Sequence, residues 1–252
     1  MTWVIKPLVV GMLNTMDKSS FLYGVDIGKK IQAPVLVWLV KNNETNEALL
    51  VDVGAAPDAI GKRDHPAVGY TQDKNQTLKV VLEKEVDDLN NIKTVIITHL
   101  HWDHSWECSL FTNAEILIQI DEMRYAISPM PIQKITYQIA TGMEPPWLGC
   151  IRKIKAINGD LDIKEGISII KLPGHTPGSQ GILVQGKRGK YLIAGDTIPL
   201  FENWKGNGTL SHIPNGIHYS LVEYYATFEK IERTNANVLP SHEIGVVGKT
   251  YE

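Results

Sequence analysis

Short apolar runs separated by polar turns recur along this chain. The runs are rich in Val, Ile and Leu and are bounded by Gly, Asn, Asp or Pro, which is typical of β-strands. Several have no polar position inside them, as expected of strands buried on both faces. We predict strands at residues 35–40, 48–53, 94–97, 115–119, 168–171, 181–184, 191–194 and 237–239.

Helical periodicity appears between the predicted strands. Apolar side chains repeat every three or four residues at Leu78, Leu82, Val86 and Leu89, and again at Leu221, Tyr225 and Phe228. A further short helix is expected at residues 121–126. Strands mixed with helices that can cover both faces of a sheet predict a layered α/β fold.

Residues 128–150 fit neither pattern. The segment contains prolines near both of its ends, yet it carries Ile, Tyr, Met and Trp, whereas a domain linker would be polar. We interpret it as a helical or loop insertion within a single domain spanning residues 1–252. Such an insertion often lines a substrate pocket, and ordinary loop packing is an equally good interpretation.

The composition limits which partners the protein could bind and which compartment it could occupy. With 25 Lys and Arg against 28 Asp and Glu, the net charge is −3, which gives no electrostatic reason to bind nucleic acid or an anionic membrane. No apolar run approaches the roughly 20 residues of a membrane span, and no secretion signal is evident, so we expect a cytoplasmic protein. Cys108 and Cys150 are expected to be free thiols of a reducing compartment.

The clearest chemical signal is a cluster of histidines and one carboxylate directly after the predicted strand at 94–97. It has the sequence His99-Leu100-His101-Trp102-Asp103-His104. In an extended segment residues i and i+2 point the same way, so His99 and His101 can share one metal ion. Asp103 and His104 can then face a second position nearby. Imidazole and carboxylate ligands suit zinc, with manganese, iron or cobalt as alternatives.

Three more candidate ligands follow later strands. His175 comes after the strand at 168–171, Asp196 after 191–194 and His242 after 237–239. Functional groups in layered α/β folds collect at strand ends, because the sheet holds them rigidly. Each residue alone is weak evidence, but together they predict one site.

These residues and their order resemble the metallo-β-lactamase superfamily, over nearly the whole chain. The resemblance implies an αββα sandwich, in which two mixed sheets are flanked by helices. It also implies that His99, His101 and His175 bind one divalent ion, that Asp103, His104 and His242 bind another, and that Asp196 bridges the pair. Asp52, at the end of the strand at 48–53, occupies the place of an aspartate that supports the metal loop in that superfamily.

Within the superfamily, the chain is most similar to N-acyl-homoserine lactonases, the quorum-quenching enzymes that open the lactone ring of signalling molecules. The resemblance implies hydrolysis by a metal-bridging hydroxide, with Asp103 as the candidate catalytic acid. Many of those enzymes carry a substrate-binding Tyr where this chain has Pro199. His218 and Tyr219 are candidate replacements, and Trp102 and Trp106 are candidate walls of the substrate pocket.

Other functions stay open at this stage. The same ligands occur in superfamily hydrolases that cleave thioesters, β-lactams or phosphodiesters. A mono-iron dioxygenase and a non-catalytic lactone sensor are further alternatives, because a ligand list does not identify the metal. A small-molecule substrate is expected in any of the enzymatic cases, and whether the chain forms a homodimer is left open.

Overall fold

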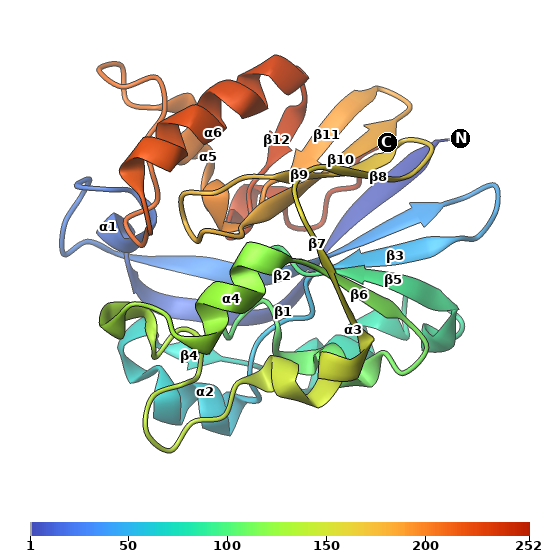
Figure 1. Cartoon of the computed structure of the whole chain (residues 1–252), viewed down its shortest axis with the longest axis horizontal. Coiled ribbons are helices and arrows are strands. Elements are labelled where there is room, and N and C mark those ends of the chain that lie inside the picture. The colour runs from blue at the N-terminus through green and yellow to red at the C-terminus, as the bar shows by residue number, and fades with distance from the viewer. Residues whose placement is uncertain (1) are drawn as a thin grey trace.

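The structure is a computed structural model that describes residues 2–252. Its strands form two mixed sheets that lie face to face (Figure 1). The first sheet has seven strands in the order β4 (Tyr70–Thr71), β1 (Trp3–Asp17), β2 (Lys30–Asn42), β3 (Ala48–Val51), β5 (Ile92–Ile96), β6 (Glu115–Gln119) and β7 (Ile154–Ile157). The second has five, in the order β12 (Asn237–Leu239), β11 (Gly189–Ile193), β10 (Gln180–Gly186), β9 (Ile167–Lys171) and β8 (Leu161–Lys164).

Helices cover the outer faces of both sheets. The helices are α1 (Lys18–Phe21), α2 (Asp58–Asp64), α3 (Leu78–Leu82), α4 (Ile120–Ile127), α5 (Phe201–Lys205) and α6 (Leu221–Thr234). Figure 1 places α6 on the five-stranded sheet, and α2 and α3 on the far side of the seven-stranded sheet. The resulting order of layers is helix, sheet, sheet, helix, so the predicted αββα fold is confirmed.

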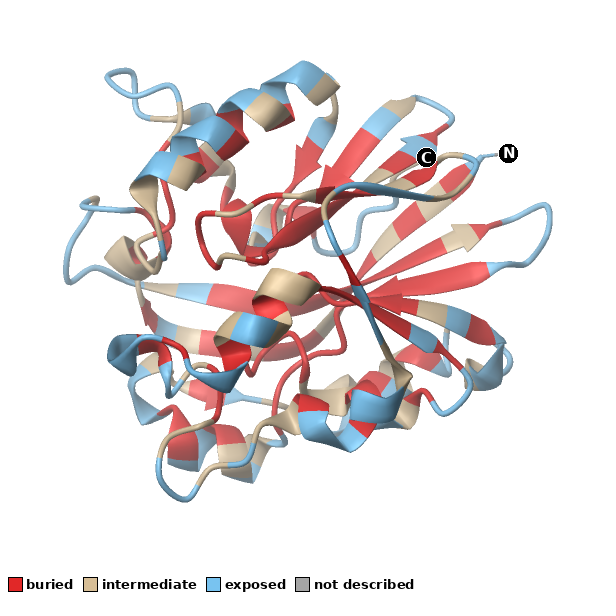
Figure 2. Cartoon of the chain, viewed as in Figure 1, coloured by how far each residue is buried: buried red, intermediate tan, exposed pale blue. Residues whose placement is uncertain are grey.

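Alternation of side chains along β2 explains why two separate cores form. Val35, Val37 and Leu39 point into the core beneath the helices, whereas Leu36 and Trp38 point into the core between the sheets. Because both faces of the strand are buried, its sequence is continuously apolar. A third core packs α6 against the five-stranded sheet. Figure 2 shows the burial concentrated in the strands and on the inward sides of the helices.

The eight predicted strands are all present, with ends shifted by a few residues, and four more were missed. The longest of these, β1, contains Lys6 and Pro7, which break its apolar pattern. Proline is tolerated there because the outer edge of β1 carries no strand at that point: among the described residues β4 pairs only with Met12 and Leu13. The other missed strands are β4, β7 and β8.

Two helix predictions need correction. The periodic pattern beginning at Leu78 yields a helix only as far as Leu82, and Leu89 begins a separate 3₁₀ turn. On α6 the buried face includes Tyr224, Phe228 and Ile231, whereas Tyr225 is exposed. The sequence pattern therefore located α6 and its buried Phe228 but wrongly placed Tyr225 on the buried face. The short helix at 121–126 is confirmed as α4.

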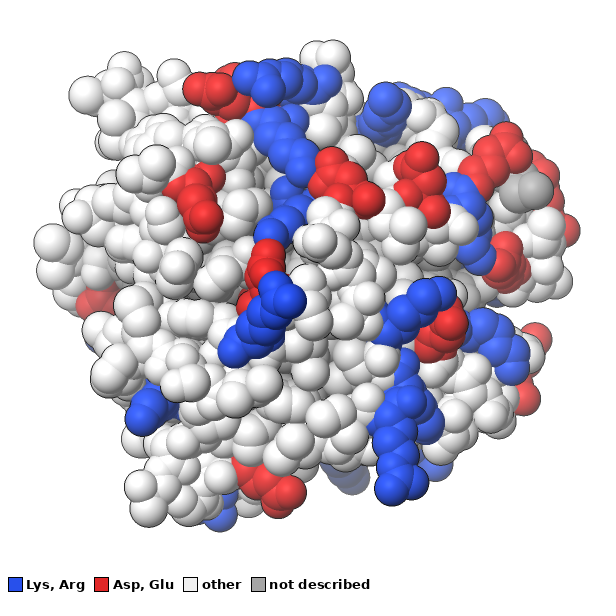
Figure 3. Space-filling view, in the orientation of Figure 1, with Lys and Arg blue, Asp and Glu red and all other residues white. Residues whose placement is uncertain are grey.

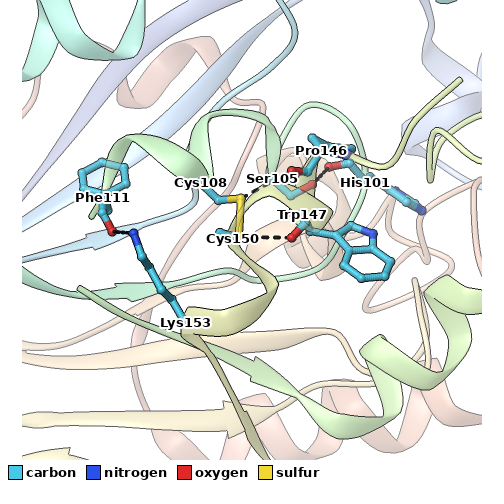
Figure 4. The surroundings of a disulfide bond; sticks show 8 residues. All are labelled: His101, Ser105, Cys108, Phe111, Pro146, Trp147, Cys150 and Lys153. Atoms are coloured by element: carbon cyan, nitrogen blue, oxygen red, sulfur yellow. Dashed lines mark hydrogen bonds between the residues drawn. A yellow bond between two sulfur atoms is a disulfide. The ribbon is translucent and has the colours of Figure 1, made fainter. Parts of the chain in front are cut away.

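The prediction of two free thiols is wrong. Cys108 and Cys150 form a disulfide, with their Cα atoms 6.0 Å apart (Figure 4). The bond joins the 3₁₀ turn Trp106–Leu110, directly after the histidine motif, to the turn Pro146–Lys153 at the end of the 128–150 segment. The argument for a reducing compartment rested on those free thiols, so it no longer has support.

Charged side chains of both signs are mixed over the face shown in Figure 3. Among the ion pairs of the described residues, Lys171 pairs with Asp121, and Lys230 pairs with Asp160 at 2.6 Å. Among residues 2–252, none of the helices combines the length and the apolar character that a membrane crossing requires.

Candidate metal centre

The candidate ligands lie in loops that leave both sheets at the same end of the sandwich. The histidine motif follows β5 of the seven-stranded sheet, and the loops carrying His175, Asp196 and His242 follow β9, β11 and β12 of the five-stranded sheet. All seven side chains predicted as ligands are buried. The site therefore exists only where the two sheets meet.

Three imidazoles converge in a first group. Nε2 of His175 lies 3.3 Å from Nε2 of His99 and 3.1 Å from Nδ1 of His101. Three ring nitrogens at such distances can coordinate one cation, and these residues form one of the potential metal-binding groups among the described residues.

A second group contains His104, His242 and Asp103. Oδ2 of Asp103 lies 3.8 Å from Nε2 of His104 and 3.7 Å from Nε2 of His242. Asp196 stands between the two groups. Its Oδ1 is 3.1 Å from Nε2 of both His104 and His242, and its Oδ2 is 3.7 Å from Nε2 of His175. One carboxylate thus faces both sets of imidazoles.

Hydrogen-bonding groups contact the Nδ1 atoms of four of the histidine ligands and fix the orientation of their rings. His175 donates to the carbonyl of Ile217 at 2.7 Å, and His242 to the carbonyl of Pro34 at 2.9 Å. When Nδ1 carries the proton, Nε2 presents its lone pair to the centre of the site. The rings of His175 and His242 are thus each oriented by a backbone carbonyl from a distant part of the chain.

Asp52 orients the other two rings. Its Oδ2 accepts from Nδ1 of His104 at 2.8 Å and from the hydroxyl of Thr98 at 2.9 Å, and that hydroxyl lies 3.1 Å from Nδ1 of His99. Asp52 also accepts from the backbone N–H of Thr98 at 2.7 Å. It adopts a left-handed backbone, with φ of +62°, which is unusual for a residue other than glycine. Its carboxylate therefore supports the motif loop directly.

Burial and charge act differently on the two groups. Burial lowers the pKa of His175 to about 4 and holds the pKa of His99 and His101 well below the usual value, so these rings are neutral at pH 7. Burial also opposes a proton on His104, but Asp196, Asp103 and Asp52 outweigh it and raise the pKa of that ring well above its usual value. The carboxylates that favour a proton there would equally favour a metal cation.

The donor set fits a pair of metal ions. Nε2 of His104 and Nε2 of His242 are buried and make no well-formed hydrogen bond, a costly state that a bound cation would relieve. Buried neutral imidazoles together with two carboxylates are the ligands that zinc and similar ions take in proteins.

A cavity of about 320 Å³ opens onto this cluster. His101, Asp103, His175 and Asp196 form its polar end, and the remaining wall is largely apolar. The residues that line the rest of the wall are Leu13, Met16, Phe21, Asp64, His65, Pro66, Ala67, Val68, Trp102, Ile135, Thr136 and Ile217. Ile135 and Thr136 belong to the 128–150 segment, which therefore contributes to the pocket.

Of the four residues predicted to contact the substrate, one lines this cavity. Trp102 lines the cavity, whereas Trp106 lines a separate cavity of about 440 Å³. His218 and Tyr219 are absent from the cavity wall: the His218 ring packs edge-on against Tyr23, and Tyr219 is exposed. Their role as replacements for the Tyr expected at Pro199 stays a prediction.

His65 was not predicted as a site residue. Its ring stacks on Trp102 with centroids 4.0 Å apart, and its Nε2 lies 2.6 Å from Nε2 of Gln138. Gln138 reaches it from a left-handed backbone, with φ of +58°. His65 lies outside any motif, so only the fold reveals its place in the cavity wall.

Comparisons with known proteins agree with this geometry. A family model described as the metallo-beta-lactamase superfamily matches residues 32–242. The N-acyl homoserine lactonase AiiA of Bacillus thuringiensis subsp. kurstaki is 27% identical over 206 residues, which cover 75% of this chain and 74% of that protein.

Two solved structures share the fold. An N-acyl homoserine lactone hydrolase with the product N-hexanoyl-L-homoserine at its catalytic metal center has a TM-score of 0.74 at 21% identity, covering 97% of this chain and 95% of that one. AidC, a dizinc quorum-quenching lactonase with a bound product, has a TM-score of 0.67 at 18% identity, covering 96% and 88%.

Proposed function

This chain belongs to the metallo-β-lactamase superfamily, and from that premise we propose that it is a metal-dependent hydrolase that opens the ring of N-acyl-homoserine lactones. The curated relatives support this reaction, because they are named N-acyl homoserine lactonases. The observation that carries the proposal is the place of Asp196, whose carboxylate lies between two groups of imidazoles at the polar end of an apolar cavity.

The proposed site holds two divalent ions, most simply zinc. One would be held by His99, His101 and His175, and the other by Asp103, His104 and His242; Asp196 would be shared between them. When bound, such a pair lowers the pKa of water and polarises a carbonyl, the two requirements of ester hydrolysis at neutral pH. Ser241 keeps Asp196 in place by donating its hydroxyl to Oδ1 at 2.6 Å.

Asp103 is the proposed proton donor to the alcohol oxygen released when the ring opens. It faces the cavity beside both groups of ligands, where its carboxylate could take the proton of the attacking water and pass it to the leaving oxygen. The apolar wall formed by residues such as Leu13, Met16 and Ile135 would bind the acyl chain and exclude water. A cavity of about 320 Å³ suits a small ligand, such as a lactone with a short acyl chain.

We also propose that residues 1–252 act as a single catalytic domain. Each group of ligands combines residues from the motif after β5 with at least one residue from a loop of the other sheet. Neither sheet alone carries a complete set of ligands for either ion.

The test combines metal analysis with a substrate panel. The purified chain should contain two metal ions and hydrolyse acyl-homoserine lactones, and a chelator should remove both properties. The variant His101→Asn should lose activity, whereas His212→Asn should not, because His212 bonds to the carbonyl of Trp204 and to Glu232 away from the cavity. Turnover of only a β-lactam, a thioester or a phosphodiester would show that the proposed substrate is wrong.

A further inference from the structure

Glu122 is a buried carboxylate that lies close to the candidate metal site without belonging to it. It sits in the first turn of α4 and has none of its surface exposed. Among the described residues, no Lys or Arg forms an ion pair with it. A buried carboxylate without a cationic partner is costly, so it is retained where its hydrogen bonds have a purpose.

The donors that reach Glu122 come from three separate segments. Its Oε1 accepts from the backbone N–H of Leu100 at 2.9 Å and from the hydroxyl of Tyr137 at 2.8 Å. Its Oε2 accepts from the hydroxyl of Thr176 at 2.6 Å.

Each donor neighbours one of the imidazoles in the first group. Leu100 stands between His99 and His101 in the chain, and Thr176 directly follows His175. The ring of Tyr137 meets the ring of His101 edge-on, with centroids 4.7 Å apart. Among the described residues, no hydrogen bond or ion pair joins Glu122 to Asp103, His104 or His242, so its hydrogen bonds serve one group of ligands only.

The close approach of α4 to the His175 loop is part of this arrangement. A Cβ on Gly178 would lie 2.2 Å from the backbone nitrogen of Glu122, a distance that only glycine avoids. Tyr137 adds a further connection, because it belongs to the same segment as Ile135 and Thr136, which line the cavity. One carboxylate thus joins the motif loop, the His175 loop and the cavity wall.

We propose that Glu122 is a positioning residue that sets the spacing of His99, His101 and His175 and couples that group of ligands to the cavity-lining segment. The inference rests on the proposed two-metal function. It distinguishes the two metal positions: the one held by His99, His101 and His175 depends on Glu122, and the one held by Asp103, His104 and His242 does not.

The first test measures metal binding position by position. Glu122→Gln cannot accept from all of these donors, so we expect one of the two ions to bind 10- to 100-fold more weakly, the usual cost of losing such a supporting contact. Metal content is measured after dialysis against graded chelator. The visible absorption spectrum of the cobalt-substituted protein then reports whether the coordination of one ion has changed.

Thr176→Val and Tyr137→Phe remove one donor each and should produce smaller changes of the same kind, which keeps the proposal testable if Glu122→Gln does not fold. Leu82→Ala on α3 is the control for lost stability. It removes a buried side chain from a helix that packs against β1, and it should lower the unfolding midpoint while leaving the cobalt spectrum unchanged.

The outcomes separate this inference from the proposed function. If the wild-type chain binds two ions and opens lactones while Glu122→Gln, or failing that Thr176→Val, binds both ions with unchanged affinity and spectrum, Glu122 has only a structural role. A wild-type chain that binds no metal would overturn both proposals together.

Discussion

The disulfide gives the most quantitative prediction about stability. Cys108 and Cys150 are separated by 42 residues in the sequence, so the bond closes a long loop of the unfolded chain. The chain-entropy relation gives about 4 kcal/mol of stabilisation for a loop of this length. Both cysteines are almost completely buried, which means that a reductant reaches the bond only when the fold opens. Substitution is therefore the cleaner perturbation.

Cys108→Ala, Cys150→Ala and the double variant should each lower the free energy of unfolding by about 4 kcal/mol, measured by urea denaturation with tryptophan fluorescence. The three values should agree within about 1 kcal/mol, because either single substitution already breaks the bond. If the double variant lost twice as much as each single variant, packing of two separate thiols would explain the result instead. A thiol titration of the wild-type protein, unfolded without reductant, should find no free thiols. Finding two per chain would refute the disulfide.

Three further predictions concern the site. Asp196→Asn should reduce the metal content below two ions per chain and abolish lactone hydrolysis, and full retention of both would show that Asp196 is not shared between the ions. Burial lowers the pKa of His65 from 6.5 to about 4; the unfolded chain therefore binds more protons in this interval, and stability should fall by up to about 1.4 kcal/mol per pH unit as the pH drops from 6.5 to 4. His65→Phe should remove that part of the slope in urea midpoints measured beside the wild type, and an unchanged slope would exclude His65 as its source. Gly178→Ala should cost about 1–3 kcal/mol in unfolding free energy, because its Cβ would meet the backbone of Glu122; a neutral result would mean that α4 can move away.

The sequence predicts a strand reliably where the apolar pattern of that strand is complete within its own residues. The run at 35–40 is apolar at every position, because β2 is buried on both faces. The same reasoning missed β1, where Lys6 and Pro7 interrupt the run at an edge that tolerates them. An edge strand is shaped by what lies beside it, and the local pattern does not contain that information.

In the candidate site, too, the sequence indicates some residues and not others. The motif from His99 to His104 is local in the sequence, and the later ligands each follow a recognisable strand, so all seven could be proposed before the fold was known. His65, Glu122 and the disulfide depend on distances between segments that are far apart in the chain. Their positions are consequences of packing, and neither residue type nor spacing indicates them.

This division follows from how the site is built. Residues that would bind the metals must offer particular atoms, so their types are restricted and can be read from the sequence. Groups that orient those residues need only place one hydrogen-bonding atom behind a ring, and the chain uses whatever lies there. A backbone carbonyl serves for His175 and His242, and a carboxylate serves for His104. Because these supporting atoms come from both sheets, the geometry of the ligands depends on the packing of the sheets against each other. Substitutions in the core between the sheets should therefore affect the metal site as well as stability, even where they touch none of its ligands.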